Sequence, residues 1–354
     1  MKTGFCNLTV KDLEEWLLGC EEKKFHARQI MSWVYEKGVD HWDEMTNLSK
    51  SLREKLEESF ELSSLKLVRC TPSDDKETFK YLWRMTDGTL VESVLICSED
   101  RRTVCVSSQV GCPAKCAFCA SGKMGFFRNL SASEIVDQVV LINAELKKKG
   151  ERVSNIVYMG MGEPLMNLNA VIRSIELLNS PSMLNISQRR ITVSTVGIVE
   201  GIHALAEKGL KISLVLSLHA PSQHIRKKII PYARKYPLDE VMLAMDRFFL
   251  KTKRDITYEY ILIAGINDKP EHARDLAKLV GSRQCVVNLI PYNPVPGLKL
   301  KRPKKDAVEF FRKILTKEGV NHTCRYTKGD DIAAACGQLA LQEDEQTNLL
   351  QVSA

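Results

Sequence analysis

The pattern of hydrophobic and polar positions changes twice along the chain. Over residues 1–65 apolar residues recur at three- and four-residue spacing, which predicts a small helical domain. Two runs rich in β-branched and aromatic residues, Thr78–Met85 and Leu90–Ile96, then flank an Asp-Gly turn. They predict a β-hairpin within an extension that covers residues 66–98.

Residues 99–325 alternate between strand-like and helical patterns. Short apolar or β-rich runs predict six strands at Thr103–Ser107, Asn155–Met159, Arg190–Ser194, Lys211–Ser217, Asp255–Ile263 and Cys285–Ile290. Helical periods predict helices at Ala132–Lys148, Leu168–Leu178, Val199–Lys208, Leu238–Lys251, Pro270–Leu279 and Lys304–Glu318. Six strand–helix units in roughly 220 residues predict an α/β fold with a partial TIM-like barrel, because a full eight-unit barrel takes about 250 residues.

Composition and cysteine content limit the class of protein. The chain has 354 residues, 44% of them hydrophobic and 27% charged, which is enough to bury a large core. We see neither a signal peptide nor an apolar stretch long enough to span a bilayer. Eleven cysteines without an export signal favour reduced thiols over a disulfide framework. We therefore expect a cytoplasmic, monomeric protein that does not bind a membrane.

The net charge of +7 gives a bias toward a polyanionic partner. Basic residues cluster at Arg189-Arg190, Arg226-Lys227-Lys228, Arg234-Lys235 and the run Lys299, Lys301, Arg302, Lys304 and Lys305. Such runs are most often solvated faces, but several of these follow predicted strands. The helical domain also mixes basic and aromatic residues, although its aromatics suit a core equally well. RNA is therefore the favoured partner, and the helical domain is predicted to bind it.

Three cysteines stand directly after the first predicted strand of the barrel. Cys112, Cys116 and Cys119 are spaced by three and then two intervening residues. A closed structural metal site takes four protein ligands, so a loop with three leaves one coordination position open for chemistry. The spacing favours an iron–sulfur cluster over buried thiols or a zinc site that a distant Cys or His completes. Active sites of such barrels lie at this end of the strands.

Polar residues also follow the other predicted strands. The second strand leads into Gly-Met-Gly-Glu-Pro at residues 160–164, which lacks the third glycine of a dinucleotide-binding fingerprint. Later strands end near Ser194, near Ser217-Leu218-His219 and near Asn293. A single Ser or Asn at such a place is more often a helix cap, but together these side chains can bind one polar ligand. In the hairpin, the strand pattern alone puts Glu92 on an exposed face.

Four segments carry a specific resemblance. They are Val-Ser-Ser-Gln-Val-Gly-Cys at residues 106–112, Met-Gly-Met-Gly-Glu-Pro-Leu at residues 159–165, Ser-Leu-His-Ala-Pro at residues 217–221 and Gly-Asp-Asp-Ile-Ala-Ala-Ala-Cys-Gly-Gln-Leu at residues 329–339. Together with the Cys-x3-Cys-x2-Cys loop, they resemble the RlmN/Cfr family of RNA methyltransferases in the radical S-adenosylmethionine (SAM) superfamily. The resemblance covers nearly the whole chain.

The resemblance implies a role for each matching residue. Cys112, Cys116 and Cys119 would ligate a 4Fe-4S cluster. The residues that would hold SAM are Gly162, Glu163, Ser194, Ser217, Leu218, His219 and Asn293. Cys336, in a C-terminal segment over residues 326–354, would carry the methyl group, with Cys105 as its disulfide partner. Without the resemblance, Cys336 reads as a small buried residue beside three alanines. Glu92 would be a proton acceptor, in contrast to the exposed position that its strand pattern favours.

The resemblance also implies a substrate and a reaction. The family methylates C2 of an adenine in 23S ribosomal RNA near the peptidyl transferase centre, and C2 of an adenine in the anticodon loop of tRNAs. An adenine ring carbon is not nucleophilic, so a radical route is needed, with two SAM molecules per turnover and an electron donor that reduces the cluster and the disulfide. A Cfr-like enzyme that methylates C8 is one alternative. A non-catalytic zinc protein that binds RNA is another.

Overall fold

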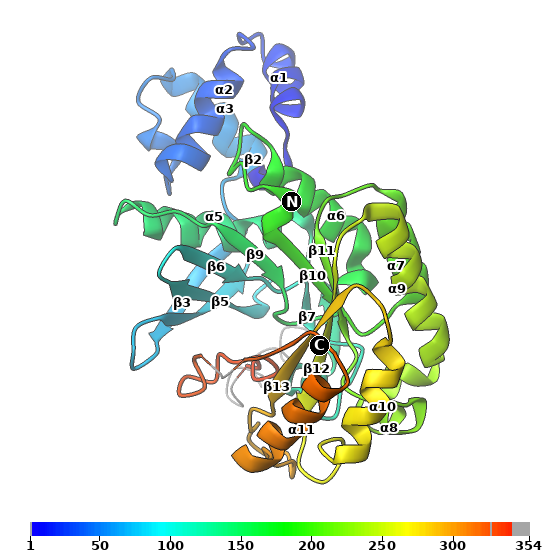
Figure 1. Ribbon diagram of the computed structural model, residues 1–354. Helices are drawn as coiled ribbons and strands as arrows, with labels where there is room; N and C mark the ends of the chain where they lie inside the picture. Colours follow the sequence, from blue (N-terminus) through cyan, green and yellow to red (C-terminus); the bar gives the residue numbers. More distant parts are fainter. Residues whose placement is uncertain (1, 326–327, 342–354) are drawn as a thin grey trace.

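The computed structural model describes residues 2–325 and 328–341. A ten-stranded sheet forms the centre, and a helical part lies at one end of the molecule beside α5 and α6 (Figure 1). The helical part contains β1 (Thr3–Gly4), α1 (Val10–Gly19), α2 (His26–Met31), a π-helical turn (Ser32–Lys37), α3 (Lys50–Ser59) and β2 (Phe60–Glu61). Thr9 and Ser49 cap α1 and α3 by accepting hydrogen bonds from backbone N–H groups. The helical pattern over this region is therefore confirmed.

The order of strands in the sheet is β14-β13-β12-β11-β10-β9-β6-β5-β4-β3. Neighbours from β6 to β14 are parallel, and those from β3 to β6 are antiparallel. The parallel strands are β6 (Arg101–Cys105), β9 (Asn155–Tyr158), β10 (Ile191–Thr195), β11 (Ser213–Ser217), β12 (Ile256–Leu262), β13 (Cys285–Pro291) and β14 (His322–Cys324). The first six match the predicted strands to within two residues at each end, so the partial barrel is confirmed.

The antiparallel strands continue the barrel sheet. They are β3 (Leu65–Pro72), β4 (Thr78–Met85) and β5 (Leu90–Ser98), and β4 and β5 form the predicted hairpin. Because β5 pairs with β6, the extension predicted over residues 66–98 shares one sheet with the barrel. The sequence gives no clear signal for β3, because it is an edge strand whose side chains are largely exposed.

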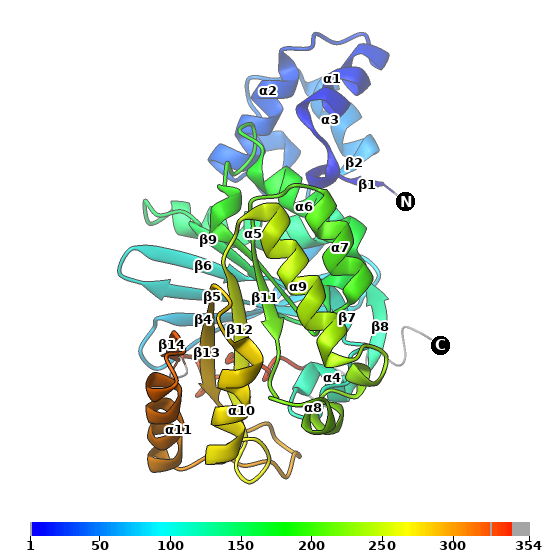
Figure 2. The same ribbon diagram turned by 45° about the vertical axis from the view of Figure 1, so that its right-hand side comes forward.

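Helices cover the outer face of the parallel strands (Figures 1 and 2). They are α5 (Ala132–Lys147), α6 (Leu168–Asn179), α7 (Val199–Glu207), α9 (Leu238–Thr252), α10 (Pro270–Val280) and α11 (Lys305–Lys317), each within one residue of its predicted bounds. A shorter helix, α8 (Gln223–Ile229), follows β11. Along the part of the chain that the structure describes, no helix is both long and apolar enough to cross a membrane. The inner face of the sheet is left for cavities.

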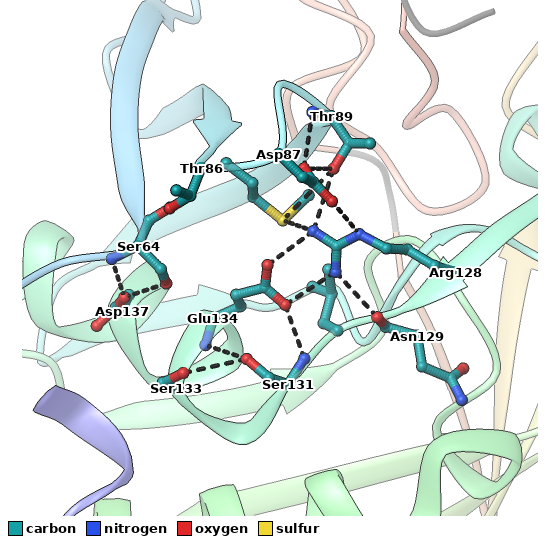
Figure 3. Close-up of polar contacts among 12 residues, drawn as sticks. Ser64, Thr86, Asp87, Thr89, Arg128, Asn129, Ser131, Ser133, Glu134 and Asp137 are labelled. Carbon is teal, nitrogen blue, oxygen red and sulfur yellow. Dashed lines mark hydrogen bonds and ion pairs between the residues drawn. The ribbon is translucent and has the colours of Figure 1, made fainter. Parts of the chain in front are cut away.

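The helical part is joined to the barrel through α5. Asp137 of α5 is buried and accepts hydrogen bonds from the backbone N–H and the hydroxyl of Ser64, at 2.7 and 2.5 Å (Figure 3). Cys6, from the N-terminal turn, also hydrogen-bonds the Asp137 carboxyl group. Further along α5, Lys147 donates to the carbonyl oxygen of Tyr35 at 2.9 Å. Charged and polar groups on one helix therefore fix the helical part to the core.

Candidate active site

The three-cysteine loop is held between two short paired strands. β7 (Gln109–Gly111) leads into the loop, α4 (Ala120–Met124) follows it, and β8 (Phe126–Asn129) pairs back onto β7. Gly122 packs onto the loop so closely that an added Cβ would lie 2.8 Å from the backbone nitrogen and 2.9 Å from the backbone oxygen of Cys116. The backbone of the loop therefore leaves no room for a side chain at this position.

Arg128 of β8 connects the cysteine loop to two other elements (Figure 3). Its guanidinium group donates to both carboxylate oxygens of Glu134, at 2.7 and 3.0 Å, and forms an ion pair with Asp87 at 2.6 Å. Glu134 caps the start of α5 together with Ser131, and Asp87 lies in the turn between β4 and β5. Arg128 therefore ties the frame of the loop to α5 and to the hairpin.

One cavity, the cysteine cavity, contains all three thiols of the loop. Cys112, Cys116 and Cys119 line it together with Gly162, Glu163, Ser194, Ser217, His219 and Cys336. Burial raises the pKa of Cys112 to about 12, while hydrogen bonding from the Ala114 backbone opposes this rise. Backbone groups of Gly122 and Ser121 act in the same way on Cys119. Such N–H donors stabilise thiolates, as iron–sulfur ligation requires.

The cysteine cavity is therefore suited to a metal cluster by its donor atoms. Within residues 2–325 and 328–341, no three Cys, His, Asp or Glu side chains are already gathered closely enough to hold a single metal ion. Three thiols around one cavity, with backbone N–H groups directed at two of them, provide the soft ligands that an iron–sulfur cluster uses. The residues present fit that group.

Glu163 supplies a buried carboxyl group beside the cysteines. It accepts hydrogen bonds from the backbone N–H groups of Val196 at 2.8 Å and Leu165 at 3.1 Å. Burial nevertheless raises its pKa to about 7. Gly162, just before it, has a φ of +106°, which favours glycine. A carboxyl group in this place can receive hydrogen bonds from the amino group of a ligand.

The ends of β10 and β11 complete this side of the cavity. The hydroxyl groups of Ser194 and Ser217 lie 3.2 Å apart. His219 is buried with a positive φ of 56°, and its Nδ1 accepts a hydrogen bond from the Ile261 backbone N–H at 3.1 Å. Burial lowers the pKa of His219 to about 3, so the ring is neutral and its Nε2 carries the proton. Leu218 is fully buried and does not line the cavity.

A buried arginine that the sequence pattern did not single out lies behind these residues. Arg226 of α8 is fully buried and donates to the backbone carbonyl oxygens of Val196, Ser217 and Leu218, at 2.5, 3.3 and 3.2 Å. Burial lowers its pKa to about 10, opposed by the nearby Cys116 thiol and Glu163 carboxyl groups. Basic runs of this kind are most often solvated faces, which holds for the two lysines of the cluster at residues 226–228 but not for Arg226.

A second cavity, the barrel cavity, lies on the inner face of the sheet. Cys105, Asn293 and Cys336 line it, and Cys336 lines the cysteine cavity as well. The Cys336 side chain is exposed through these cavities, so its interpretation as a small buried residue is wrong. The surrounding protein still raises its pKa to about 11 by desolvation, and the carboxyl group of Glu259 adds to this. Cys336 is thus placed where two compartments meet.

The segment around Cys336 is fastened to the cysteine loop and to β13. The backbone N–H of Ala120 donates to the carbonyl oxygen of Gly337 at 2.8 Å, and the Ser121 hydroxyl donates to that of Leu339 at 2.5 Å. The Asn293 amide donates to the carbonyl oxygen of Cys336 at 3.3 Å. Arg302, from the predicted basic run, donates in turn to the Asn293 side chain at 2.9 Å. Arg302 is exposed, as expected for the basic run, and it also positions the Asn293 side chain.

Cys105 and Glu92 lie on neighbouring strands. Burial raises the pKa of Cys105, and the Cys336 thiol raises it further. Glu92 is 1% exposed and forms an ion pair with Lys80 at 3.2 Å, so the exposed position that its pattern favoured is wrong. Because Val94 of β5 is opposite Cys105, Glu92 shares a sheet face with Cys105. Glu92 itself lines neither of the two cavities.

A partial parallel barrel with three cysteines after its first strand defines a radical SAM enzyme. Residues 106–277 match the radical SAM superfamily, and residues 3–62 match the ribosomal RNA large subunit methyltransferase N-terminal domain. The chain belongs to the RlmN family of SAM-dependent RNA methyltransferases. Radical SAM enzymes use SAM and an iron–sulfur cluster. Membership of this family excludes the non-catalytic zinc protein.

Similar proteins span almost the whole chain. A probable dual-specificity RNA methyltransferase RlmN 2 of Protochlamydia amoebophila is 66% identical and covers 95% of this chain and 94% of its own length. A probable dual-specificity RNA methyltransferase RlmN of Thermotoga maritima is 45% identical, with 95% and 97% covered. The crystal structure of a radical SAM methyltransferase from Sphaerobacter thermophilus superimposes with a TM-score of 0.93 at 43% identity, covering 95% of this chain and 98% of that chain.

Proposed function

We propose that the protein methylates C2 of an adenine in 23S ribosomal RNA near the peptidyl transferase centre, and C2 of an adenine in the anticodon loop of tRNAs. The name of its relatives, dual-specificity RNA methyltransferase, supports two kinds of RNA substrate. The observation that carries the proposal is the position of Cys336 between the cysteine cavity and the barrel cavity. A methyl carrier needs access to a donor on one side and an acceptor on the other.

The cysteine cavity is the proposed cofactor site. Cys112, Cys116 and Cys119 hold a 4Fe-4S cluster in this proposal, and SAM is bound by Gly162, Glu163, Ser194, Ser217, Leu218 and His219. Asn293, which lines the barrel cavity and hydrogen-bonds the Cys336 backbone, contacts SAM from the boundary between the two cavities. When bound, the cluster and two SAM molecules per turnover supply the electron, the methyl group and the radical that the reaction needs. Leu218 contributes through its backbone, because its side chain lies away from the cavity.

Cys336 first takes up the methyl group on its sulfur. With a pKa of about 11, the thiol must lose its proton to become a nucleophile, and the positive charge of Arg325 opposes the effects of burial and Glu259 on this step. The exposure of Cys336 to the cysteine cavity gives the sulfur access to a methyl donor there. The methylated sulfur then lies at the boundary of the barrel cavity as well.

Transfer to the adenine ring involves two further residues of the chain. The S-methyl group loses one hydrogen atom to the radical that bound SAM would supply, so that its carbon can bond to C2. Glu92 then accepts the proton that leaves the ring carbon. The ion pair with Lys80 supports this role, because it favours the ionised carboxylate. Cys105 then forms a disulfide with Cys336 as the carbon–sulfur bond breaks, and an external electron donor reduces this disulfide. The shared cavity and the effect of the Cys336 thiol, which raises the pKa of Cys105, support the pairing.

Nucleoside mass spectrometry of ribosomal RNA and tRNA, from cells with and without this protein, tests the proposal. We expect 2-methyladenosine in both RNAs only when the protein is present. Detection of 8-methyladenosine alone would instead identify the Cfr-like reaction. Anaerobically purified protein should contain iron and sulfide in a 1:1 ratio. We place this activity in the cytoplasm and propose that the protein acts as a monomer.

A further inference from the structure

The barrel cavity has two chemically different ends. At the ends of the strands it meets the cysteine cavity, and the two share Met159, Ile290 and Cys336. At the other end its lining reaches Arg101, the first residue of β6, and Arg190, which directly precedes β10. The inner face of the sheet therefore runs from two arginines at the start of the strands to the sulfur of Cys336, near which Arg325 also lines the cavity.

The side chains of Arg101 and Arg190 stabilise no other part of the described structure through a polar contact. Both are exposed, and within residues 2–325 and 328–341 neither side chain forms an ion pair or a hydrogen bond. The contrast with Arg102 is clear, because its guanidinium group pairs with Glu151 and donates to the carbonyl oxygen of Ser98. Two exposed guanidinium groups that line a cavity are suited to an anionic ligand that enters it from solvent.

We propose that the barrel cavity binds the acceptor adenine nucleotide of the RNA, which enters past the starts of β6, β9 and β10, and that Arg101 and Arg190 contact the phosphates flanking it. The inference rests on the proposed function. The cofactor side of Cys336 belongs to the cysteine cavity, so the acceptor must approach the sulfur from the barrel cavity. A base that leaves its stack carries one phosphate on each side, which matches the two exposed arginines that line the cavity.

Asn155 gives this cavity a means to orient the base. It is the first residue of β9 and lines the cavity near the two arginines. Its Oδ1 accepts a hydrogen bond from Ser154 at 2.9 Å, while its amide NH2 group has no partner within the described residues. An asparagine amide pairs with the N6 and N7 atoms of adenine. Since C2 lies across the ring system from N7, this pairing turns C2 toward Cys336.

The test compares two charge-reversal variants that change the net charge equally. One is Arg101→Glu/Arg190→Glu, and the control is Arg247→Glu/Arg274→Glu on the outer helices α9 and α10, where both residues are exposed. Binding of an unmodified tRNA transcript is measured by fluorescence anisotropy at several salt concentrations. For the first variant we expect at least tenfold weaker binding than for the control, and a log–log salt slope smaller by about 1.4, the value for two lost phosphate contacts on a single strand.

Two further measurements keep the outcomes separate. Methylation of Cys336 by SAM, followed by mass spectrometry of the protein, should be equal in wild type and both variants, since it needs no RNA. A variant that lost this methylation would be replaced by Arg101→Gln/Arg190→Gln. Equal tRNA affinity and equal salt slopes in the cavity variant and the control would overturn the inference. Failure of the wild type to methylate any RNA would instead overturn the proposed function, and the binding comparison would still stand.

Asn155 is tested with a modified base. An anticodon stem–loop with 7-deazaadenosine at the target position lacks the N7 acceptor. We expect this change to weaken binding to the wild type about as much as Asn155→Ala weakens binding of the unmodified RNA, with no additional loss when both changes are combined. Additive losses would show that Asn155 does not contact N7.

Discussion

The backbone N–H of Ala120 donates a 2.8 Å hydrogen bond to the carbonyl oxygen of Gly337. These two residues directly follow Cys119, the last cysteine of the loop, and Cys336, the proposed methyl carrier. With Gly337 at a φ of +82° and packed over Phe118 and Cys119, the carrier segment lies directly against the cysteine loop. Any displacement of one loop therefore acts on the other.

Replacement of Cys336 separates the two roles of the thiols. Cys336→Ala should retain the iron and sulfide content of the wild type and abolish RNA methylation, because the three proposed cluster ligands are unchanged in this variant. Iron and sulfide analysis, the visible absorbance spectrum and nucleoside mass spectrometry would be compared. Cys20→Ala in the helical part is the control and should behave as wild type. Methylation by Cys336→Ala would contradict the division of labour.

Gly122 allows a test of the cysteine loop by steric means. In Gly122→Ala the new methyl group would lie within 3 Å of two backbone atoms of Cys116, so the loop must shift. We expect less than half of the wild-type iron content after reconstitution. Gly19→Ala, at the end of α1, has no atom within 4 Å of its Cβ and should leave iron content unchanged. Equal iron content in both variants would show that the loop tolerates the shift.

Arg226 should affect both stability and SAM binding. Arg226→Met removes the guanidinium group that donates hydrogen bonds to three backbone carbonyl oxygens. We expect the free energy of unfolding to fall by about 3 kcal/mol. Arg226→Lys should recover only part of this, since an ammonium group does not reproduce the planar fork of donors. Urea denaturation and SAM binding by calorimetry measure the two effects. Unchanged SAM affinity in the lysine variant would limit Arg226 to a structural role.

Asp137 predicts a specific dependence of stability on pH. Burial raises its pKa from 3.8 to about 6, although hydrogen bonds from Cys6 and Ser64 oppose this rise. The neutral form is favoured in the folded state, so the associated stability is fully present below pH 4 and is lost as the pH rises through about 6. Relative to Asp137→Asn, the wild type should lose about 3 kcal/mol over this range, as urea denaturation can measure.

An opposite sign is expected at a second aspartate. Although partial burial raises the pKa of Asp12, hydrogen bonds from Thr9 lower it below 3.8 overall. Its stabilising effect is therefore present at neutral pH and is lost as the pH falls through its folded-state pKa. The free energies of unfolding of Asp12→Asn and the wild type should therefore converge as the pH falls. For Asp137→Asn the sign is opposite, because the wild type gains stability relative to this variant in acid.

A difference in the free energy of unfolding between the wild type and Asp137→Asn that does not change with pH would contradict the raised pKa of Asp137.

The sequence predicted the barrel better than it predicted the site. Strands such as Ile256–Leu262 are buried on both faces, so their continuous apolar runs identify them without tertiary information. β14 has only three residues and shows no usable pattern. Motif residues such as Glu163 and Ser194 could be chosen because they follow strands. The structure brings them to one cavity, while their individual roles stay predictions.

Residues that depend on tertiary contacts could not be predicted in this way. Arg226 has the same sequence context as the exposed lysines that follow it, and only the packing of α8 against the strand ends buries it. Glu92 lies in an ordinary strand pattern, and its ion pair with Lys80 of the neighbouring strand in a buried position is visible only in the folded protein. Arg128 gave no motif signal, because its two partners come from a helix and a turn that are separate in sequence.

The position of Cys336 between two cavities has a kinetic consequence. In the proposed function, the sulfur of Cys336 receives its methyl group through one cavity while the other is empty, so the donor and the acceptor need not be bound together. The methylation of Cys336 can then precede RNA binding, and the enzyme can persist with Cys336 already methylated. A fraction of the protein isolated from cells would then carry 14 additional mass units on Cys336. The step that consumes the first SAM and the step that modifies RNA would therefore occur at different times.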